Sequence, residues 1–173
     1  KVHEVCQLPE GSIPNGVTLD RAGTFVYCDL GKQAVMKCAP DGKVTKIVDQ
    51  VGDVKLTLPN FCSYDAEGNL YISNSSTEDI SKVLGEITTP SPKGALVRVR
   101  PDGRGDVVAT GIYLANGTAI DPNEDVCDRL LVDQSDTHDT RFGLVEDVWS
   151  RSLQDNGISD LACQRTGFSG AAK

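Results

Sequence analysis

Short runs in which hydrophobic and polar residues alternate recur along much of the chain. Such alternation is typical of β-strands that bury one face. Between residues 13 and 50 the runs fall at four places: 17–19, 25–27, 34–38 and 44–48. The last two runs are separated by Asp41-Gly42, a dipeptide that favours a tight hairpin turn. The pattern therefore predicts a unit of four short strands in this stretch.

The same unit occurs three times, and each copy opens on a motif that contains an asparagine. The three asparagines are Asn15, Asn60 and Asn116, and the copies span about 13–50, 58–111 and 114–167. The second copy carries an insertion at 76–93, which is polar and contains prolines and which we expect to form a loop. The third copy is regular through Leu130–Asp133 and departs from the pattern after that point.

A repeat of this length indicates an all-β fold of the β-propeller type. Propeller blades have four strands and repeat about every 40–50 residues. A β-sandwich also has evenly spaced strands, but it does not explain why one turn recurs at the same place in each unit. We therefore predict a single propeller domain over 1–173, with about three four-stranded blades.

Three blades are too few for a closed ring, since propellers typically have about four to eight. Three explanations remain open: a homodimer that completes a six-bladed ring, a piece of a longer protein, or a last third that folds differently. Residues 2–8 have the pattern of one leading strand, which could complete the last blade of a partner. We favour the homodimer, because two-fold dimers are the commonest oligomers.

Composition and charge narrow the possible partners. Asp and Glu number 25 against 17 Lys and Arg, a net charge of −8, which disfavours binding to nucleic acid. No apolar run approaches the roughly 18 residues of a membrane-spanning helix. The six cysteines form no close pair of the zinc-knuckle type. We expect mostly buried, reduced thiols and a cytoplasmic protein, rather than a secreted or periplasmic one with three disulfides.

The motif residues also carry a family resemblance. Residues 14–29 read PNGVTLDRAGTFVYCD, and similar patterns follow from Pro59 and from Ala115. This pattern resembles the senescence-marker-protein/gluconolactonase/luciferin-regenerating superfamily of six-bladed propellers, and it is shared with strictosidine-synthase-like and paraoxonase-like propellers. The resemblance covers residues 10–135 well and the tail poorly.

The resemblance implies a site in the central channel. In that family the motif asparagines help to hold a divalent cation, usually calcium, which polarises a lactone or ester carbonyl. Carried over, this role falls to Asn15, Asn60 and Asn116, with Glu10 as the candidate for the channel glutamate. Asn-Gly is also a common turn dipeptide, so turn formation alone is an alternative for each asparagine. Three neutral amides carry little charge for calcium binding.

Other polar residues are weaker candidates. Asp29, Asn74 and Asp133 end the second strand of successive units, where they could reach the channel mouth or cap a turn. His138 lies between acidic residues and could act as a base, although a solvated loop is the simpler interpretation. Asp133 and His138 are therefore our candidates for catalytic residues.

The function that we predict is a divalent-cation-dependent lactone or ester hydrolase of the gluconolactonase type. A catalytically silent propeller that binds a small ligand or a protein is the first alternative. A strictosidine-synthase-like activity is the second, and it would need a late channel glutamate, for which Glu146 is the available residue. Signatures of serine hydrolases, zincins and phosphate-binding loops are absent from the sequence.

Overall fold

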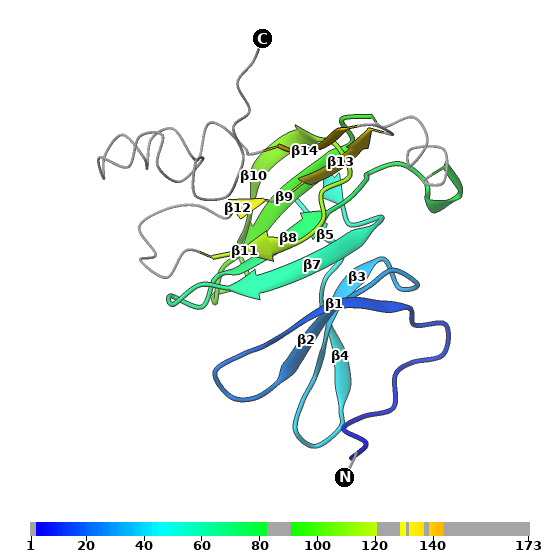
Figure 1. Ribbon diagram of the computed structural model, residues 1–173. Coiled ribbons are helices and arrows are strands. Elements are labelled where there is room, and N and C mark those ends of the chain that lie inside the picture. Colours follow the sequence, from blue (N-terminus) through cyan, green and yellow to red (C-terminus); the bar gives the residue numbers. More distant parts are fainter. Residues whose placement is uncertain (1–2, 83–90, 121–128, 131, 137–138, 144–173) are drawn as a thin grey trace.

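The computed structural model describes residues 3–82, 91–120, 129–130, 132–136 and 139–143. In these parts of the chain nearly all regular structure is β-strand, joined by turns and one short 3-10 helix, η1 (Ile80–Lys82). Figure 1 shows two twisted sheets that meet where β1 (Pro14–Leu19) lies next to β7 (Pro59–Tyr64). The all-β propeller prediction is confirmed.

The first sheet, which we call blade 1, is an antiparallel meander. Its strands pair in the order β1-β2-β3-β4, with β2 at Phe25–Asp29, β3 at Ala34–Cys38 and β4 at Val44–Val48. The turn from β1 to β2 needs Gly23, which has φ +78. Side-chain Oδ1 of Asp20 accepts hydrogen bonds from the backbone nitrogens of Ala22 and Thr24, both at 2.8 Å, and so closes this turn.

The second sheet, blade 2, repeats the same order. It consists of β7, β8 (Leu70–Asn74), β9 (Gly94–Val99) and β10 (Gly105–Ile112). Asp65 takes the place of Asp20 and accepts a 2.7 Å hydrogen bond from the backbone nitrogen of Asn69. Equivalent residues therefore make equivalent turns, which explains why the repeat is visible in the sequence.

The segment between the blades forms a small hairpin that the alternation of hydrophobic and polar residues does not predict. Residues Gln50–Val51 (β5) and Val54–Lys55 (β6) form a small hairpin. Val51, Val54 and the following Leu56 are buried in the core between the blades. This connection therefore contributes to the packing of the blades as well as joining them.

The third unit is described in part. Strand β11 (Thr118–Ala119) pairs with β12 (Arg129–Leu130), and β13 (Val132–Asp136) pairs with β14 (Asp139–Gly143). The rest of the third copy, residues 144–167, lies outside the described residues. In the described part of the chain, no helix is long and apolar enough to cross a membrane.

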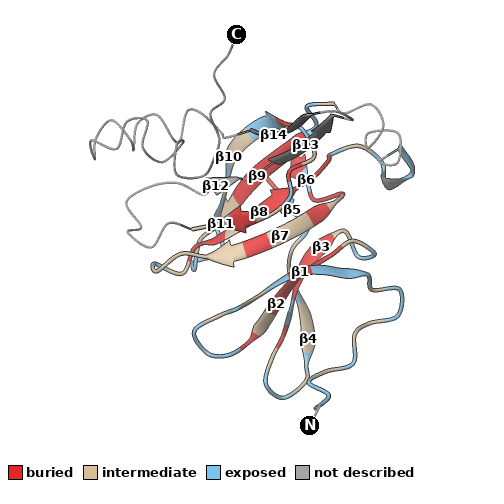
Figure 2. Cartoon of the chain, in the orientation of Figure 1, coloured by how far each residue is buried: buried red, intermediate tan, exposed pale blue. Residues whose placement is uncertain are grey.

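The main core lies between the two blades. Val26, Cys28 and Val35 of blade 1 pack with side chains from β7, β8 and β9 of blade 2, among them Cys62 and Ile72. Figure 2 shows this burial concentrated in the central strands of each sheet. Because alternate residues of a strand face opposite ways, β2 and β3 present a second set of side chains on the other side of blade 1.

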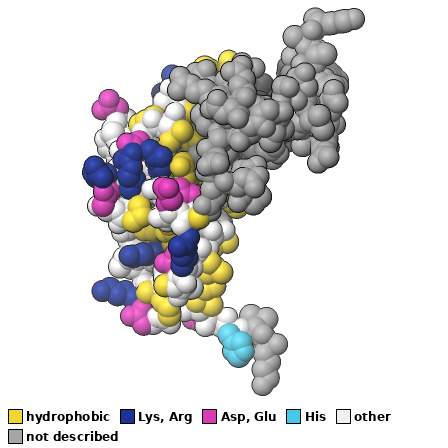
Figure 3. Space-filling view, turned by 90° about the vertical axis from the view of Figure 1, so that its left-hand side faces the viewer, with side chains coloured by type: hydrophobic (Ala, Val, Ile, Leu, Met, Phe, Trp, Pro, Cys, Tyr) yellow, Lys and Arg dark blue, Asp and Glu magenta, His cyan; other side chains and the backbone are white. Residues whose placement is uncertain are grey.

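That second side, the outer face of blade 1, is apolar and partly open. It carries Val17 and Leu19, which are 52% and 54% exposed, beside the buried Tyr27 and Met36. In blade 2 the residue equivalent to Val17 is Cys62, which is fully buried against blade 1. Hydrophobic side chains are visible on the surface in the lower half of the molecule (Figure 3).

The expected leading strand at 2–8 is not formed by its described residues, 3–8. A strand requires a hydrogen-bonded neighbour, and here the segment has none within the described sheets. Instead, it runs from the start of β1 toward the hairpin between β3 and β4 (Figure 1). Leu8 packs against Tyr27, Ala34 and Met36, so the segment covers part of the outer face of blade 1.

Candidate functional site

The first two motif asparagines, Asn15 and Asn60, each lie in a β-bulge at the start of the first strand of a blade. In blade 1, Pro14 pairs with Asp29 but the next regular pair is Val17 with Tyr27, so Asn15 falls in the irregular stretch. In blade 2 the register shifts at the same place, on either side of Asn60. Bulges change the direction of a side chain and are common near functional sites. We call this edge of the two sheets the motif edge.

The end of the second strand in each blade fixes the approach to the bulge. Asp29 Oδ1 accepts hydrogen bonds from the backbone nitrogens of Ile13, at 2.9 Å, and Lys32, at 3.0 Å. Asn74 Oδ1 accepts one from the nitrogen of Leu58 at 3.0 Å. Both side chains are fully buried. Of the two roles that the sequence left open, Asp29 and Asn74 therefore have the turn-capping one.

Gly16 brings the first two motifs into contact. A Cβ atom at this position would lie 2.6 Å from the carbonyl oxygen of Asn60 and 2.7 Å from the Cα of Phe61. Real Cβ atoms do not approach backbone atoms this closely, so the backbone of β1 can lie against that of β7 only where the side chain is absent. The Gly of the Asn-Gly dipeptide is therefore a packing residue.

The third motif is held against blade 2 by serines. Ser75 Oγ donates to the carbonyl oxygen of Ala115 at 2.6 Å, and Ser73 Oγ donates to that of Asn116. Asn60 Nδ2 donates in turn to Ser75 Oγ at 3.0 Å. A continuous set of hydrogen bonds thus runs from the side chain of Asn60 to the backbone that carries Asn116.

These contacts bring the three motif segments together, as the repeat predicts. Asn15 and Asn116 are exposed and Asn60 is half-buried. Because Asn60 uses its amide nitrogen on Ser75, its carbonyl oxygen is the atom left to face a ligand. Sequence reasoning did not find Ser75. Its signal was the run Asn74-Ser75-Ser76, three small polar residues at the end of a buried strand.

The structure also describes the positions of Glu10 and Asp133. The exposed Glu10 lies in a turn beside the connection between β2 and β3, where its carbonyl oxygen accepts a 2.5 Å hydrogen bond from Lys32 Nζ. Asp133 lies in β13, opposite Phe142. His138 and Glu146 lie outside the described residues.

The insertion in the second unit belongs to the motif edge. It leaves β8 after Asn74 and returns at β9, whereas the same connection in blade 1 is four residues, 30–33. The residue between β8 and the insertion, Ser75, is the one bonded to Asn60. The backbone nitrogen of Thr77 donates to the carbonyl oxygen of Lys93 at 3.0 Å, which closes the base of the loop.

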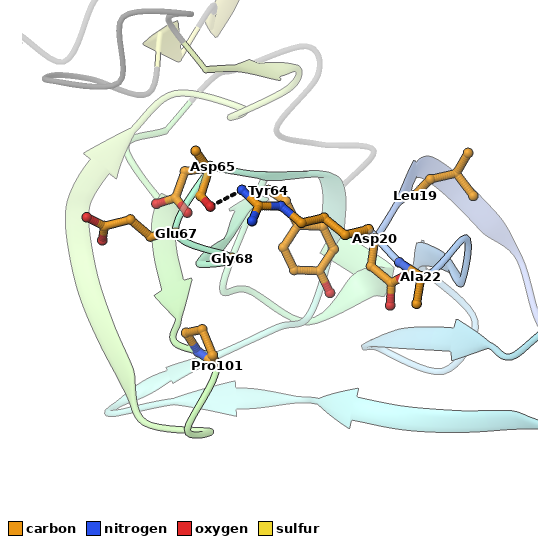
Figure 4. A pocket seen from close by; sticks show the side chains of 10 residues that line it. Leu19, Asp20, Ala22, Tyr64, Asp65, Glu67, Gly68 and Pro101 are labelled. Atoms are coloured by element: carbon orange, nitrogen blue, oxygen red, sulfur yellow. Dashed lines mark hydrogen bonds between the residues drawn. The ribbon is translucent and has the colours of Figure 1, made fainter.

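A separate hollow lies at the opposite edge of the sheets. It has a volume of about 680 Å³ and lies between the turn after β1 and the turn after β7 (Figure 4). The Arg21 guanidinium crosses it and donates to the carbonyl oxygen of Ala66. Partial burial raises the pKa of Asp20, but the hydrogen bonds from Thr24 and Ala22 outweigh it, so the net shift is downward. The acids here are turn-forming residues.

The donors at the motif edge are hard oxygen atoms. Amide and carboxylate oxygens are the ligands that calcium prefers, and no sulfur or imidazole group lies among these candidates. Within the residues that the structure describes, no three His, Cys, Asp or Glu side chains form a group suited to a metal ion. These oxygen donors are therefore of the type that binds a hard cation, but the three asparagine amides carry no charge.

Comparison with known proteins identifies the family of the chain. A family model described as the SMP-30/Gluconolactonase/LRE-like region matches residues 1–138. The chain belongs to this family. Among curated proteins, the gluconolactonase of Zymomonas mobilis subsp. mobilis is 26% identical over 145 residues, which cover 83% of this chain and 38% of that protein.

Solved structures show the same relationship for this SMP-30/gluconolactonase/LRE-like chain. An X-ray structure of a protein assigned to the gluconolactonases is 25% identical, with a TM-score of 0.53, covering 64% of this chain and 39% of that one. A gluconolactonase from Xanthomonas campestris is 20% identical, with a TM-score of 0.51, covering 65% of this chain and 38% of that one, and it supports the fold alone. The chain spans less than two fifths of the length of each relative.

Proposed function

We propose that this chain contributes part of the active site of a divalent-cation-dependent hydrolase that opens lactones or related esters at the motif edge. The observation that carries the proposal is the set of contacts that joins the three motif segments: Gly16 lies against Asn60, Asn60 bonds through Ser75 to the carbonyl oxygen of Ala115, and Ser73 bonds to that of Asn116. Family membership and the gluconolactonase relatives support the reaction class. The motif edge would then face the central channel of the complete ring.

In this proposal the cation is calcium, held by the side-chain oxygens of Asn15, Asn60 and Asn116 with Glu10 supplying charge. When bound, such an ion polarises the carbonyl of the substrate and stabilises the oxyanion formed on attack. Asn60 is oriented before any ligand arrives, because Ser75 fixes its amide nitrogen. Asp133 and His138 remain our candidates for the base that takes a proton from the attacking water.

Calcium is expected to raise the melting temperature of the chain, and EDTA to reverse the rise. A ligand at about 100 times its dissociation constant stabilises a folded state by about 2.7 kcal/mol. In Asn60→Ala, the increase in melting temperature caused by calcium should be about half as large or smaller, because one ligand and its positioning hydrogen bond are lost. Gln50→Ala, which removes an exposed amide of the β5–β6 hairpin, should leave it unchanged.

Hydrolysis of a panel of aldonolactones, with and without calcium, is the companion measurement. We expect calcium-dependent hydrolysis that is lost in Asn60→Ala and retained in Gln50→Ala. The proposal would be wrong if calcium left the melting temperature unchanged and the unmodified chain hydrolysed no lactone under either condition.

We also propose that a second copy of the chain completes the propeller. The open outer face of blade 1 supports this, since the equivalent side of blade 2 is covered by a neighbouring blade. Size-exclusion chromatography with multi-angle light scattering should give twice the mass of one chain. Leu19→Lys, a charge placed on the exposed apolar face, should shift the mass to that of a monomer. A monomeric mass for the unmodified chain at micromolar concentration would refute the shared ring.

A further inference from the structure

Two cysteines of blade 1 point to opposite sides of the sheet. Cys28 lies on β2 with Val26, on the side that faces blade 2, and it belongs to the core between the blades. Cys38 ends β3 and pairs with Phe25 and Val44. It follows Met36 at a spacing of two residues, so it lies on the outer face of blade 1. Each of these two thiols meets a second cysteine.

The pair between the blades is sealed from solvent. Cys28 and Cys62 are both fully buried. The hydrogen bond from Cys62, followed by burial, raises the pKa of the Cys28 thiol far above its ordinary value. Cys62 Sγ also lies 3.8 Å from the carbonyl oxygen of Val26. Because thiolates are the reactive form and oxidants need access, this pair is expected to be inert in the folded protein.

The pair on the outer face is different, because one of its members is partly exposed. Cys38 is 1% exposed, whereas Cys6 is half-buried in the N-terminal segment, which we define as residues 3–12. Cys6 acts on the pKa of the Cys38 thiol through a side-chain hydrogen bond and through its charge, so the two thiols are neighbours. Burial, and next the hydrogen bond to Cys6, raises the pKa of Cys38 to about 11.

Two further contacts hold the N-terminal segment in this position. Leu8 packs against the side chains of Tyr27, Ala34 and Met36 on the outer face. The carbonyl oxygen of Val5 lies close to the β3–β4 hairpin, 3.7 Å from where a Cβ of Gly42 would stand. Cys6 is thus placed over Cys38 by the residues on either side of it. The juxtaposition does not depend on the two thiols alone.

We propose that Cys6 and Cys38 are a disulfide-forming pair that fastens the N-terminal segment to the outer face of blade 1. The oxidant is a small-molecule disulfide of the glutathione class. This site goes beyond the hydrolase proposal and does not depend on it. The Cys28–Cys62 pair serves as the internal reference, because it has similar sulfur contacts without access.

The reaction proceeds by two thiol–disulfide exchanges. The thiolate of the accessible Cys6 attacks one sulfur of glutathione disulfide, which forms a mixed disulfide and releases one glutathione thiolate. The thiolate of Cys38 then attacks the Cys6 sulfur and releases the second glutathione. The two protein thiols lose two electrons and two protons, and glutathione disulfide is reduced to two molecules of glutathione.

Tryptic mapping separates the possible products, because the four described cysteines fall on four different peptides. These peptides are 2–21, 22–32, 38–43 and 56–82. The folded full chain is incubated with glutathione disulfide, its remaining thiols are blocked, and it is digested without reduction. We expect a linked 2–21/38–43 product that disappears on reduction. Peptides 22–32 and 56–82 should carry the blocking group only when blocking is done after unfolding.

Variants test the order of the two steps and the role of the link. Cys38→Ser should retain glutathione on Cys6 as a stable mixed disulfide, because the second exchange is removed. Cys6→Ser should leave Cys38 unmodified, because the buried thiol meets no oxidant directly. In the unmodified chain, oxidation should slow amide hydrogen exchange over residues 3–12 by about tenfold or more, an effect that Cys6→Ser abolishes.

Several outcomes would overturn the proposal. One is a folded chain in which peptide 2–21 stays unlinked, or is linked to a peptide other than 38–43, while glutathione disulfide is in excess. Another is oxidation of Cys28 and Cys62 at the same rate as Cys6. Unchanged hydrogen exchange over residues 3–12 in a chain that carries the Cys6–Cys38 link would refute the fastening role.

Discussion

Gly16→Ala is expected to lower the free energy of unfolding by about 3 kcal/mol, at the upper end of what overpacking usually costs. The added methyl group would meet the carbonyl oxygen of Asn60 and the Cα of Phe61, at 2.6 and 2.7 Å. These are backbone atoms of β7, which cannot rotate away as a side chain can. Relief therefore requires β1 to move away from β7, and the core between the blades opens with it.

Gly117→Ala is the matched control, because Gly117 follows Asn116 in the third copy of the same motif. No heavy atom lies within 4 Å of a Cβ at Gly117, and its φ does not require glycine. We expect a change of less than about 1 kcal/mol, of either sign. Urea unfolding of both variants gives the comparison. Equal midpoints for the two would show that Gly16 is a turn residue and not a packing residue.

Asn74→Asp is expected to destabilise the chain by a similar amount, about 3 kcal/mol at neutral pH, because it places a charge where none can be accommodated. Asn74 Nδ2 donates to the carbonyl oxygens of Ser76, at 2.8 Å, and Lys55, at 3.3 Å. A carboxylate oxygen in its place would face two acceptors in a fully buried site. Two hydrogen bonds would be replaced by two repulsive contacts.

The reciprocal change, Asp29→Asn, should be nearly neutral, within about 1 kcal/mol. Asp29 uses Oδ1 to accept from the nitrogens of Ile13 and Lys32, and an asparagine can do the same. Its other oxygen, Oδ2, is buried without a hydrogen-bond donor, so the exchange replaces one unpartnered polar atom by another and removes a buried charge. Asp29→Asn in blade 1 therefore serves as the control for Asn74→Asp in blade 2.

The effect of pH distinguishes charge from shape in the Asn74→Asp variant. Burial beside two carbonyl oxygens raises the folded-state pKa of the new carboxyl group above its unfolded value of about 3.9. Between these two pKa values the folded state binds more protons than the unfolded state, so stability falls as pH rises and then levels off. A penalty that stays constant from pH 4 to pH 7 would indicate a steric cause.

The sequence predicted the fold because each blade repeats its turn chemistry. Asp20 and Asp65 close the same turn, and alternation marks the paired strands, so local rules agree with the tertiary structure. The positions of Asn15 and Asn60 followed from that register. The β5–β6 hairpin was missed, because two-residue strands are too short to show a period.

The contacts that hold the motifs together could not be predicted from the sequence in the same way. The bond from Asn60 to Ser75 joins strand β7 to the connection after β8, and the bond from Ser75 to Ala115 joins blade 2 to the third unit. Nothing in a single sequence distinguishes these serines from the other small polar residues of a loop. The role of Gly16 is similar, because the dipeptide Asn-Gly is ordinary turn chemistry until the neighbouring blade is in place. The pairing of Cys6 with Cys38 is also a tertiary contact, between a segment that forms no strand and β3.

The insertion at the motif edge has a consequence for how this scaffold could diversify. Both ends of the loop are fixed, at Ser75 by Asn60 and at Lys93 by Thr77, so its length is decoupled from the sheet below it. Lengthening a loop costs little free energy, about 0.6 kcal/mol for each doubling. Under the hydrolase proposal, exchanging residues 78–92 would therefore change the substrate preference while the blade, its register and its asparagine are inherited unchanged.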